Sequence, residues 1–280
     1  MSGGSERVAG EVRAARLSDG ASLEYEVLGD GPPLVMLHGF ISGRFTFSRQ
    51  RREFAARHRL IMVSARGHDG SDGRLPANYG AGTSDIEDLR AVLDAEGLER
   101  FSLVAHSSGG ATGFVFACRY PERVANAVLI EPTLYTVLPP ADFDPIVEMT
   151  EELAATAESK GAEAALRTML EAIAGEAWRS LDAETRALRL KGMARIAPLA
   201  VPHGRGLCAL PITDEDIRGL RPPTLLFYGT ESFPFERVIA DRFRAFRPDL
   251  RIILADKAGH NEHRDRPDLV NAETLSFLAS

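Results

Sequence analysis

The stretch LVAHSSGGATG, residues 103–113, carries an apolar run directly into two serines and two glycines. Where a buried strand turns at once into a helix, the residue at the turn is strained and its side chain is exposed at the carboxyl edge of a sheet. We therefore interpret Ser107 as a candidate nucleophile. Ala105 and Gly109, two residues before and after it, are small enough for the helix to pack closely on the strand. The alternative is that Ser107 and Ser108 only cap the helix.

The rest of the chain alternates between strand-like and helix-like patterns. Helices are expected between the strands, for example over 47–58 and from Ser84 onward. Such alternation is typical of an α/β fold, here a doubly wound, mostly parallel, eight-stranded sheet whose first two strands form an antiparallel hairpin. The predicted strands are 11–17, 22–29, 33–39, 59–65, 101–106, 123–131, 221–229 and 250–255.

One long segment, 132–220, interrupts this alternation. It has helical composition punctuated by prolines and contains no convincing strand. We expect it to form a helical cap inserted between 11–131 and 221–280, which together make the core. Residues 1–10 predict a disordered lead-in.

Composition and charge exclude several classes of protein. Among 280 residues, 44% are hydrophobic and 26% charged, which is enough for a large core. The net charge of −7 argues against nucleic acid or an anionic membrane as partner.

There is no apolar run of spanning length and no secretory signal, so we expect a cytoplasmic enzyme, monomeric or homodimeric. Cys118 and Cys208 match neither a disulfide framework nor a metal-ligand spacing, and we expect no metal and no cofactor.

A nucleophilic serine needs a base and an oxyanion site. His260, in AGH (258–260) just past the last predicted strand, is the candidate base, because a histidine on that loop can reach over the sheet edge to take the serine proton. We expect His263, three residues later, to face solvent. HGF (38–40) ends the third strand, so the backbone amides of Phe40 and Ser108 are the candidate oxyanion donors.

Taken together, HGF, AHSSGG, RGHDGSDG (66–73) and AGH resemble the α/β-hydrolase fold superfamily from residue 11 to residue 280. The resemblance implies the fold described above and an active site at the carboxyl edge of the sheet. The sequence departs from the usual pattern at two positions. Asp69 stands where glycine is common, and Ser64 stands where an acidic residue is common.

The same resemblance implies an aspartate three residues after Gly229, but Ser232 occupies that position. Two other acids are candidates. Glu231 is adjacent, and Glu131 ends the strand that follows the nucleophile helix. We favour Glu131, because an unpaired acid at the end of an apolar strand is costly and because some superfamily branches, including zearalenone lactonases and some haloalkane dehalogenases, take their acid from this strand. The alternative role for Glu131 is to anchor a neighbouring loop.

The likeness to zearalenone-type lactonases also includes the two serines before glycine, TESF (230–233) and EAWRSLDAETRAL (176–188). It makes Trp178 the first candidate for contact with substrate. Tyr135, as part of the cap, and His38 are further candidates independent of this likeness.

The expected function is therefore that of a serine hydrolase. It would cleave an ester or lactone of a small hydrophobic molecule through an acyl-enzyme on Ser107. Dehalogenases and epoxide hydrolases of this fold attack with aspartate, so a serine disfavours their chemistry. A C–C bond hydrolase, a cofactor-free peroxidase and a small-molecule receptor of the same fold remain alternatives.

Overall fold

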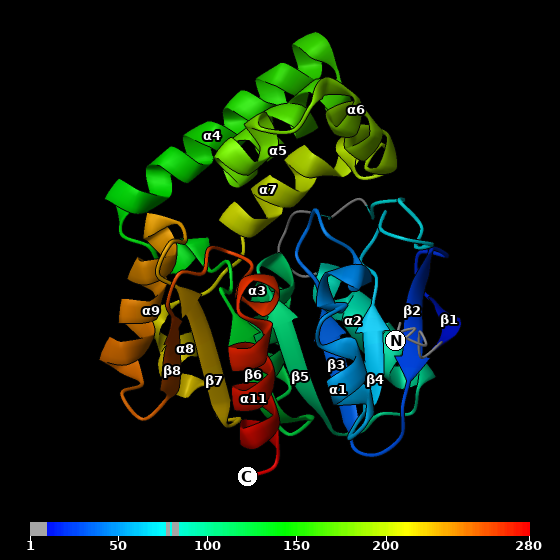
Figure 1. Cartoon of the computed structure of the whole chain (residues 1–280), viewed down its shortest axis with the longest axis vertical. Coiled ribbons are helices and arrows are strands. Elements are labelled where there is room, and N and C mark those ends of the chain that lie inside the picture. Colours follow the sequence, from blue (N-terminus) through cyan, green and yellow to red (C-terminus); the bar gives the residue numbers. More distant parts are fainter. Residues whose placement is uncertain (1–9, 77–78, 80–83) are drawn as a thin grey trace, which may run out of the picture.

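The computed structural model describes residues 10–76, 79 and 84–280 (Figure 1). Residues 1–9 of the predicted lead-in lie outside the described residues. Within the described part of the chain, no helix combines the length and the apolar character that crossing a membrane requires.

Eight strands form one sheet in the order β1-β2-β4-β3-β5-β6-β7-β8. β1 and β2 form an antiparallel hairpin and β2 runs antiparallel to β4, whereas the remaining pairs are parallel. The prediction of a doubly wound, mostly parallel, eight-stranded sheet is confirmed. The strands are β1 (Glu11–Arg16), β2 (Ser22–Leu28), β3 (Pro33–Leu37), β4 (Arg59–Val63), β5 (Phe101–His106), β6 (Val124–Ile130), β7 (Thr224–Gly229) and β8 (Arg251–Ala255).

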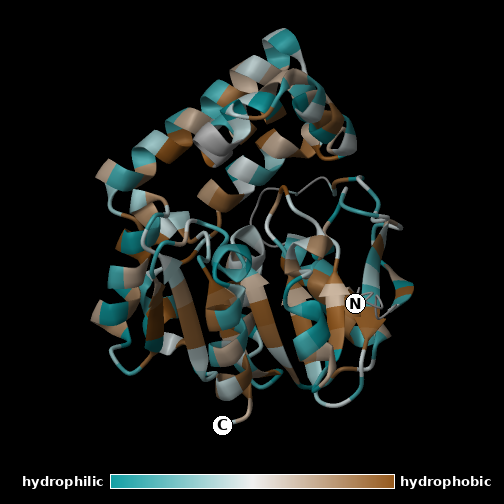
Figure 2. Ribbon diagram, in the orientation of Figure 1, coloured by the Kyte–Doolittle hydropathy of each residue, from teal (hydrophilic) through white to brown (hydrophobic). Residues whose placement is uncertain are grey.

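Helices cover both faces of the sheet. The apolar side chains of α2 (Ser84–Ala95), α3 (Ser108–Arg119), α8 (Asp214–Gly219) and α9 (Pro234–Phe246) share one core with one face of the strands. Those of α1 (Arg51–Ala55) and α11 (Pro267–Leu278) pack on the other face. The central strands are apolar along much of their length, as expected for strands buried on both faces (Figure 2).

The cap lies over the carboxyl edge of the sheet (Figure 1). It consists of α4 (Pro140–Lys160), α5 (Ala162–Arg179), α6 (Ala183–Gly192) and α7 (Ala200–Cys208), with short 3-10 turns η2 (Tyr135–Val137) and η3 (Ala197–Leu199). The last helix of the inserted segment, α8, packs instead on the sheet beside α9. Its Ile217 is fully buried in the main core, and its Asp214 pairs with Arg242 of α9 at 2.9 Å.

The helix expected over 47–58 is shorter than predicted. Residues 43–50 form successive 3-10 bonds, including η1 (Arg44–Phe47), so the α-helix begins only at Arg51. It ends at Ala55, because the chain must reverse direction to enter β4 at Arg59.

Candidate active site

Ser107 lies at the turn between β5 and α3 in a strained backbone conformation, with φ 56° and ψ −123°. Its amide donates to the carbonyl of Ile130 at 3.0 Å, which fixes the turn against β6. A Cβ atom on Gly109 would lie 2.5 Å from the carbonyl oxygen of His38, so glycine is required for the helix to approach this closely. The geometry agrees with the small residues expected on either side of Ser107.

The structure brings Ser107, His260 and Glu131 together in one hydrogen-bonded chain. Ser107 Oγ lies 2.9 Å from His260 Nε2, and His260 Nδ1 lies 2.5 Å from Glu131 Oε2. Glu131 is completely buried just after β6, with φ 42°. Its other oxygen accepts from the amide of Gly229 at 2.9 Å. This carboxylate is therefore fixed on both oxygens and faces the histidine.

Glu231, the other candidate acid, lies elsewhere. Glu231 is exposed, and its backbone amide donates to the carbonyl of Ala258 at 2.9 Å. Ser232 faces the site instead, and its hydroxyl donates to Glu131 Oε2 at 2.5 Å. A carboxylate from β6 and a hydroxyl after β7 thus occupy the position where the family resemblance implies a single aspartate.

The two candidate oxyanion donors lie beside the serine. Phe40 and Ser108 both line the cavity that contains Ser107. The loop that carries Phe40 approaches so closely that a Cβ on Gly39 would lie 3.0 Å from the Cβ of Ser107. No hydrogen bond within the described part of the chain uses the backbone N–H of Phe40 or Ser108. Ser108 also begins α3, whose N-terminal dipole favours a developing negative charge.

A cavity of about 340 Å³ lies between the cap and the part of the core that carries Ser107 and His260. Its polar lining includes Ser107 and His260 on the core side and Thr150 and His203 on the cap side, and Tyr135 also lines it. The cap and the loop after β7 contribute mainly apolar walls, so the cavity is suited to an apolar molecule with one reactive polar group. The apolar lining includes Phe40, Ile41, Pro145, Ile146, Met149, Leu153, Met169, Leu207, Phe233 and Phe235.

Two of the predicted substrate contacts are corrected by the structure. Trp178 is 2% exposed and packs inside the cap with Leu166 and Leu170, away from the cavity lining. His38 is buried and does not line this cavity; it donates from Nδ1 to the carbonyl of Gly39 at 2.8 Å and accepts from the amide of Ala65 at 3.0 Å. Burial lowers the pKa of His38 to about 3, so this ring is a neutral brace between two loops.

The expectation that His263 faces solvent is wrong. The side chain is completely buried, with Nε2 2.8 Å from Thr46 Oγ1 and the ring centroid 5.2 Å from that of Phe47. Its carbonyl accepts from Gln50 at 2.7 Å. The short helix α10 (Glu262–Asp265) turns this side chain inward, and burial lowers its pKa to about 3.

Sequence reasoning missed two side chains around the triad. His106 Nε2 donates to the backbone carbonyl of His260 at 2.7 Å and so holds the loop that carries the base. Burial holds the pKa of His106 well below its usual range, which keeps the ring neutral. Thr133 Oγ1 lies 3.2 Å from Ser107 Oγ. In the sequence, the position of His106 directly before the proposed nucleophile in AHSSGG is the feature that could have indicated its role.

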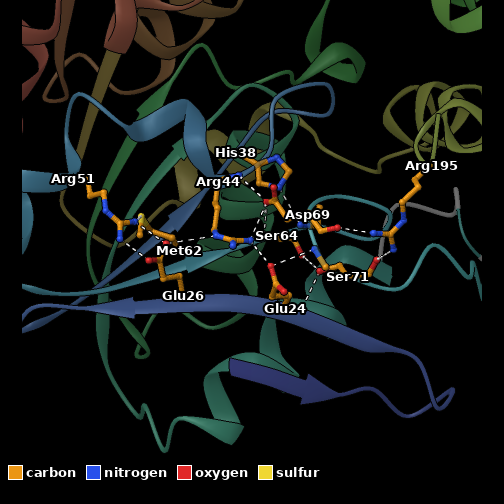
Figure 3. Close-up of polar contacts among 12 residues, drawn as sticks. Glu24, Glu26, His38, Arg44, Arg51, Met62, Ser64, Asp69, Ser71 and Arg195 are labelled. Atoms are coloured by element: carbon orange, nitrogen blue, oxygen red, sulfur yellow. Dashed lines mark hydrogen bonds and ion pairs between the residues drawn. The ribbon is translucent and has the colours of Figure 1, made fainter. Parts of the chain in front are cut away.

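The departures at Ser64 and Asp69 compensate for each other (Figure 3). Ser64 Oγ donates to Asp69 Oδ2 at 2.6 Å, and Arg44 Nη1 lies 3.2 Å from the same oxygen. The carboxylate missing from position 64 is thus supplied from position 69. Arg195, from the cap, donates to the carbonyls of Asp69 and Ser71 at 2.5 and 2.6 Å. This network joins the loop that carries Phe40, the 66–73 loop and the cap.

Three donor groups near the triad are close enough to share a cation. The donor atoms of Glu131, Glu236 and His260 lie within 4.8 Å of one another. The 2.5 Å between His260 Nδ1 and Glu131 is, however, the distance of a hydrogen bond, shorter than the roughly 3.3 Å that separates two ligands on one tetrahedral zinc. The distance therefore fits a histidine oriented by a hydrogen bond to Glu131 better than two ligands of one metal ion.

Comparison with known proteins identifies the family of the chain. A family model described as alpha/beta hydrolase fold matches residues 32–267, so the chain belongs to that family. The chain is 26% identical to epoxide hydrolase 4 of Mus musculus, over 94% of this chain and 78% of that protein. It is 25% identical to carboxylesterase YbfK of Bacillus subtilis, over 89% of this chain and 81% of that protein.

Among solved structures, the fold is similar to that of Est816, described as an N-acyl homoserine lactone degrading enzyme. The TM-score is 0.73 at 22% identity, over 95% of this chain and 100% of that chain.

Proposed function

We propose that this protein is a serine hydrolase that cleaves a carboxylic ester or lactone of a small apolar molecule through an acyl-enzyme on Ser107. The observation that carries the proposal is the continuous chain from Ser107 Oγ to His260 Nε2 at 2.9 Å and from His260 Nδ1 to Glu131 at 2.5 Å. This is the arrangement of a nucleophile, its base and the acid that orients the base.

In the proposed mechanism, His260 takes the proton of Ser107 as the oxygen attacks the substrate carbonyl. The amides of Phe40 and Ser108 stabilise the tetrahedral oxyanion, each contributing roughly 3 to 4 kcal/mol in the transition state. Glu131 stabilises the imidazolium that forms. His260 then protonates the leaving alcohol, and water hydrolyses the acyl-enzyme by the same route.

The substrate class is inferred from the cavity and from the relatives. A mainly apolar cavity of about 340 Å³ that contains Ser107 and His260 suits a compact ester or lactone. One relative is named a carboxylesterase and one structural neighbour is described as a lactone-degrading enzyme, and both names support this substrate class. Another relative is named an epoxide hydrolase, which favours a different reaction. The likeness to zearalenone-type lactonases stays a prediction.

A panel of p-nitrophenyl esters and macrocyclic lactones tests the proposal. Wild-type protein should hydrolyse members of the panel, and Ser107→Ala should lose at least about a thousandfold in kcat, because the acyl-enzyme cannot form. Glu131→Gln should lose most of its kcat, whereas Glu231→Gln, the matched control, should behave as wild type. Full activity of Ser107→Ala, or a defect confined to Glu231→Gln, would contradict the assignments. If the protein hydrolyses C–C bond substrates or epoxides but no ester or lactone, the proposed reaction is wrong.

A further inference from the structure

A second carboxyl group lies on the same side of His260 as Glu131. Glu236 is the third residue of α9, and its side chain is 1% exposed. Its Oε1 atom lies 3.8 Å from His260 Nδ1. Neither of its oxygens has a hydrogen-bond partner among the described residues. A buried acid without a partner is costly, so its position against the ring of the base requires an explanation.

The surroundings of Glu236 disfavour its charge while Glu131 is ionised. Burial, and then the charge of Glu131, hold the pKa of Glu236 well above its usual range. The other titratable groups that face it are Tyr135 from η2, Tyr228 from β7 and Glu262 from α10. None of these is a cation, and His260 is the group nearby that gains positive charge during the proposed reaction.

We propose that Glu236 is a second positioning residue for His260, uncharged while Glu131 carries the negative charge and ready to replace Glu131 when that charge is lost. The inference rests on the proposed function, because it concerns the orientation of the base in that reaction. Glu236 lines the same cavity as Ser107, and the role proposed for it is exerted through His260.

Two physical effects support the replacement. Burial, which raises the pKa of Glu236 most, remains when Glu131 loses its charge, but the repulsion by Glu131 is removed, so the pKa of Glu236 falls. The position of Glu236 in the first turn of α9, a helix of 13 residues, also favours its carboxylate through the helix dipole. An imidazolium at 3.8 Å then supplies the opposite charge, and a small side-chain movement closes the gap to a hydrogen bond.

Glu262 provides a matched control. Like Glu236 it is completely buried, and its pKa is raised by burial and then by the charge and the side-chain contact of Glu131. Unlike Glu236, it makes no ion pair with His260. A general effect of removing a buried acid should therefore appear equally at both positions, whereas the proposed role belongs to Glu236 alone.

The experiment compares Glu131→Gln with Glu131→Gln/Glu236→Gln and Glu131→Gln/Glu262→Gln in the full chain. The best p-nitrophenyl ester found for wild-type protein serves as substrate, and kcat and KM are measured from pH 5 to pH 10. We expect Glu131→Gln to retain a kcat about tenfold above that of the Glu236 double variant, with similar KM, and the Glu262 double variant to match Glu131→Gln. The kcat of Glu131→Gln should rise with pH through an ionisation that the Glu236 double variant lacks.

Equal kcat values and pH profiles for Glu131→Gln and its Glu236 double variant would overturn the inference, as would an equal loss in the Glu262 double variant. Thermal unfolding followed by circular dichroism identifies a variant that fails to fold. In that case Glu131→Gln/Glu236→Asp, which keeps a carboxylate, must retain the pH-dependent activity. A wild-type protein inactive on every ester would refute the proposed function instead.

Discussion

At the scale of single residues, Ser232 and Glu131 together account for the place of the carboxylate proposed to orient His260. Ser232 stands three residues after Gly229, where the family resemblance implies aspartate, and its hydroxyl donates to Glu131 Oε2 at 2.5 Å. The two side chains come from the ends of neighbouring parallel strands, β6 and β7. Either strand can therefore present a carboxylate to the same face of His260.

This proximity predicts that the acid can be moved from one strand to the other. Glu131→Gln should lower kcat by a factor between roughly 10² and 10⁴, because the imidazolium loses its counter-charge. Adding Ser232→Asp should recover at least about tenfold of that loss, because it places a carboxylate within reach of His260 Nδ1. Steady-state kinetics on one ester measures both effects. If Glu131→Gln/Ser232→Asp is no faster than Glu131→Gln, the two positions are not equivalent for His260.

At the scale of elements, Arg195 connects the cap to the core. It donates to the carbonyls of Asp69 and Ser71, and Asp69 in turn pairs with Arg44 at the end of the loop that carries Phe40 (Figure 3). The cap and the loop that carries Phe40 are thus held by the same short segment, residues 69–71.

We expect Arg195→Ala to affect substrate binding more than the chemical step. Loss of two hydrogen bonds from a charged donor should loosen the cap wall, raising KM about three- to tenfold while kcat changes less. Arg205→Ala is the matched control, since Arg205 pairs with Glu151 inside the cap at 2.5 Å and not with the core. Steady-state kinetics of both variants checks the expectation. Equal KM changes in the two would show that the contact with the 66–73 loop has no special role.

The elements also show how far sequence patterns determine this structure. The central strands could be predicted because buried parallel strands are continuous apolar runs, and Ser107 and Glu131 directly follow two such runs. Trp178 could not be placed, because helix packing alone decides whether a cap residue faces the cavity or the cap interior. The contact of His106 with the carbonyl of His260 joins residues 154 positions apart, and no local pattern specifies it.

At the scale of the whole molecule, buried neutral histidines couple stability to pH. His38, His106 and His263 are each less than 5% exposed, and burial lowers the pKa of each. In the unfolded chain these rings take up protons near pH 6.5. Because each folded pKa lies below the unfolded value, their contribution to stability is present above pH 6.5 and is lost as the pH falls toward the folded pKa.

His263→Asn isolates one of these contributions to the free energy of unfolding. At pH 8 the variant should be less stable than wild type by about 1 to 3 kcal/mol, because it loses packing against Phe47 and its hydrogen bond to Thr46. At pH 5 the deficit should shrink by about 2 kcal/mol, since wild type alone loses roughly 1.4 kcal/mol per pH unit at this site below pH 6.5. Urea unfolding at both pH values measures the two differences. A deficit that stays constant between pH 8 and pH 5 would mean that His263 takes up its proton equally in the folded and unfolded chains.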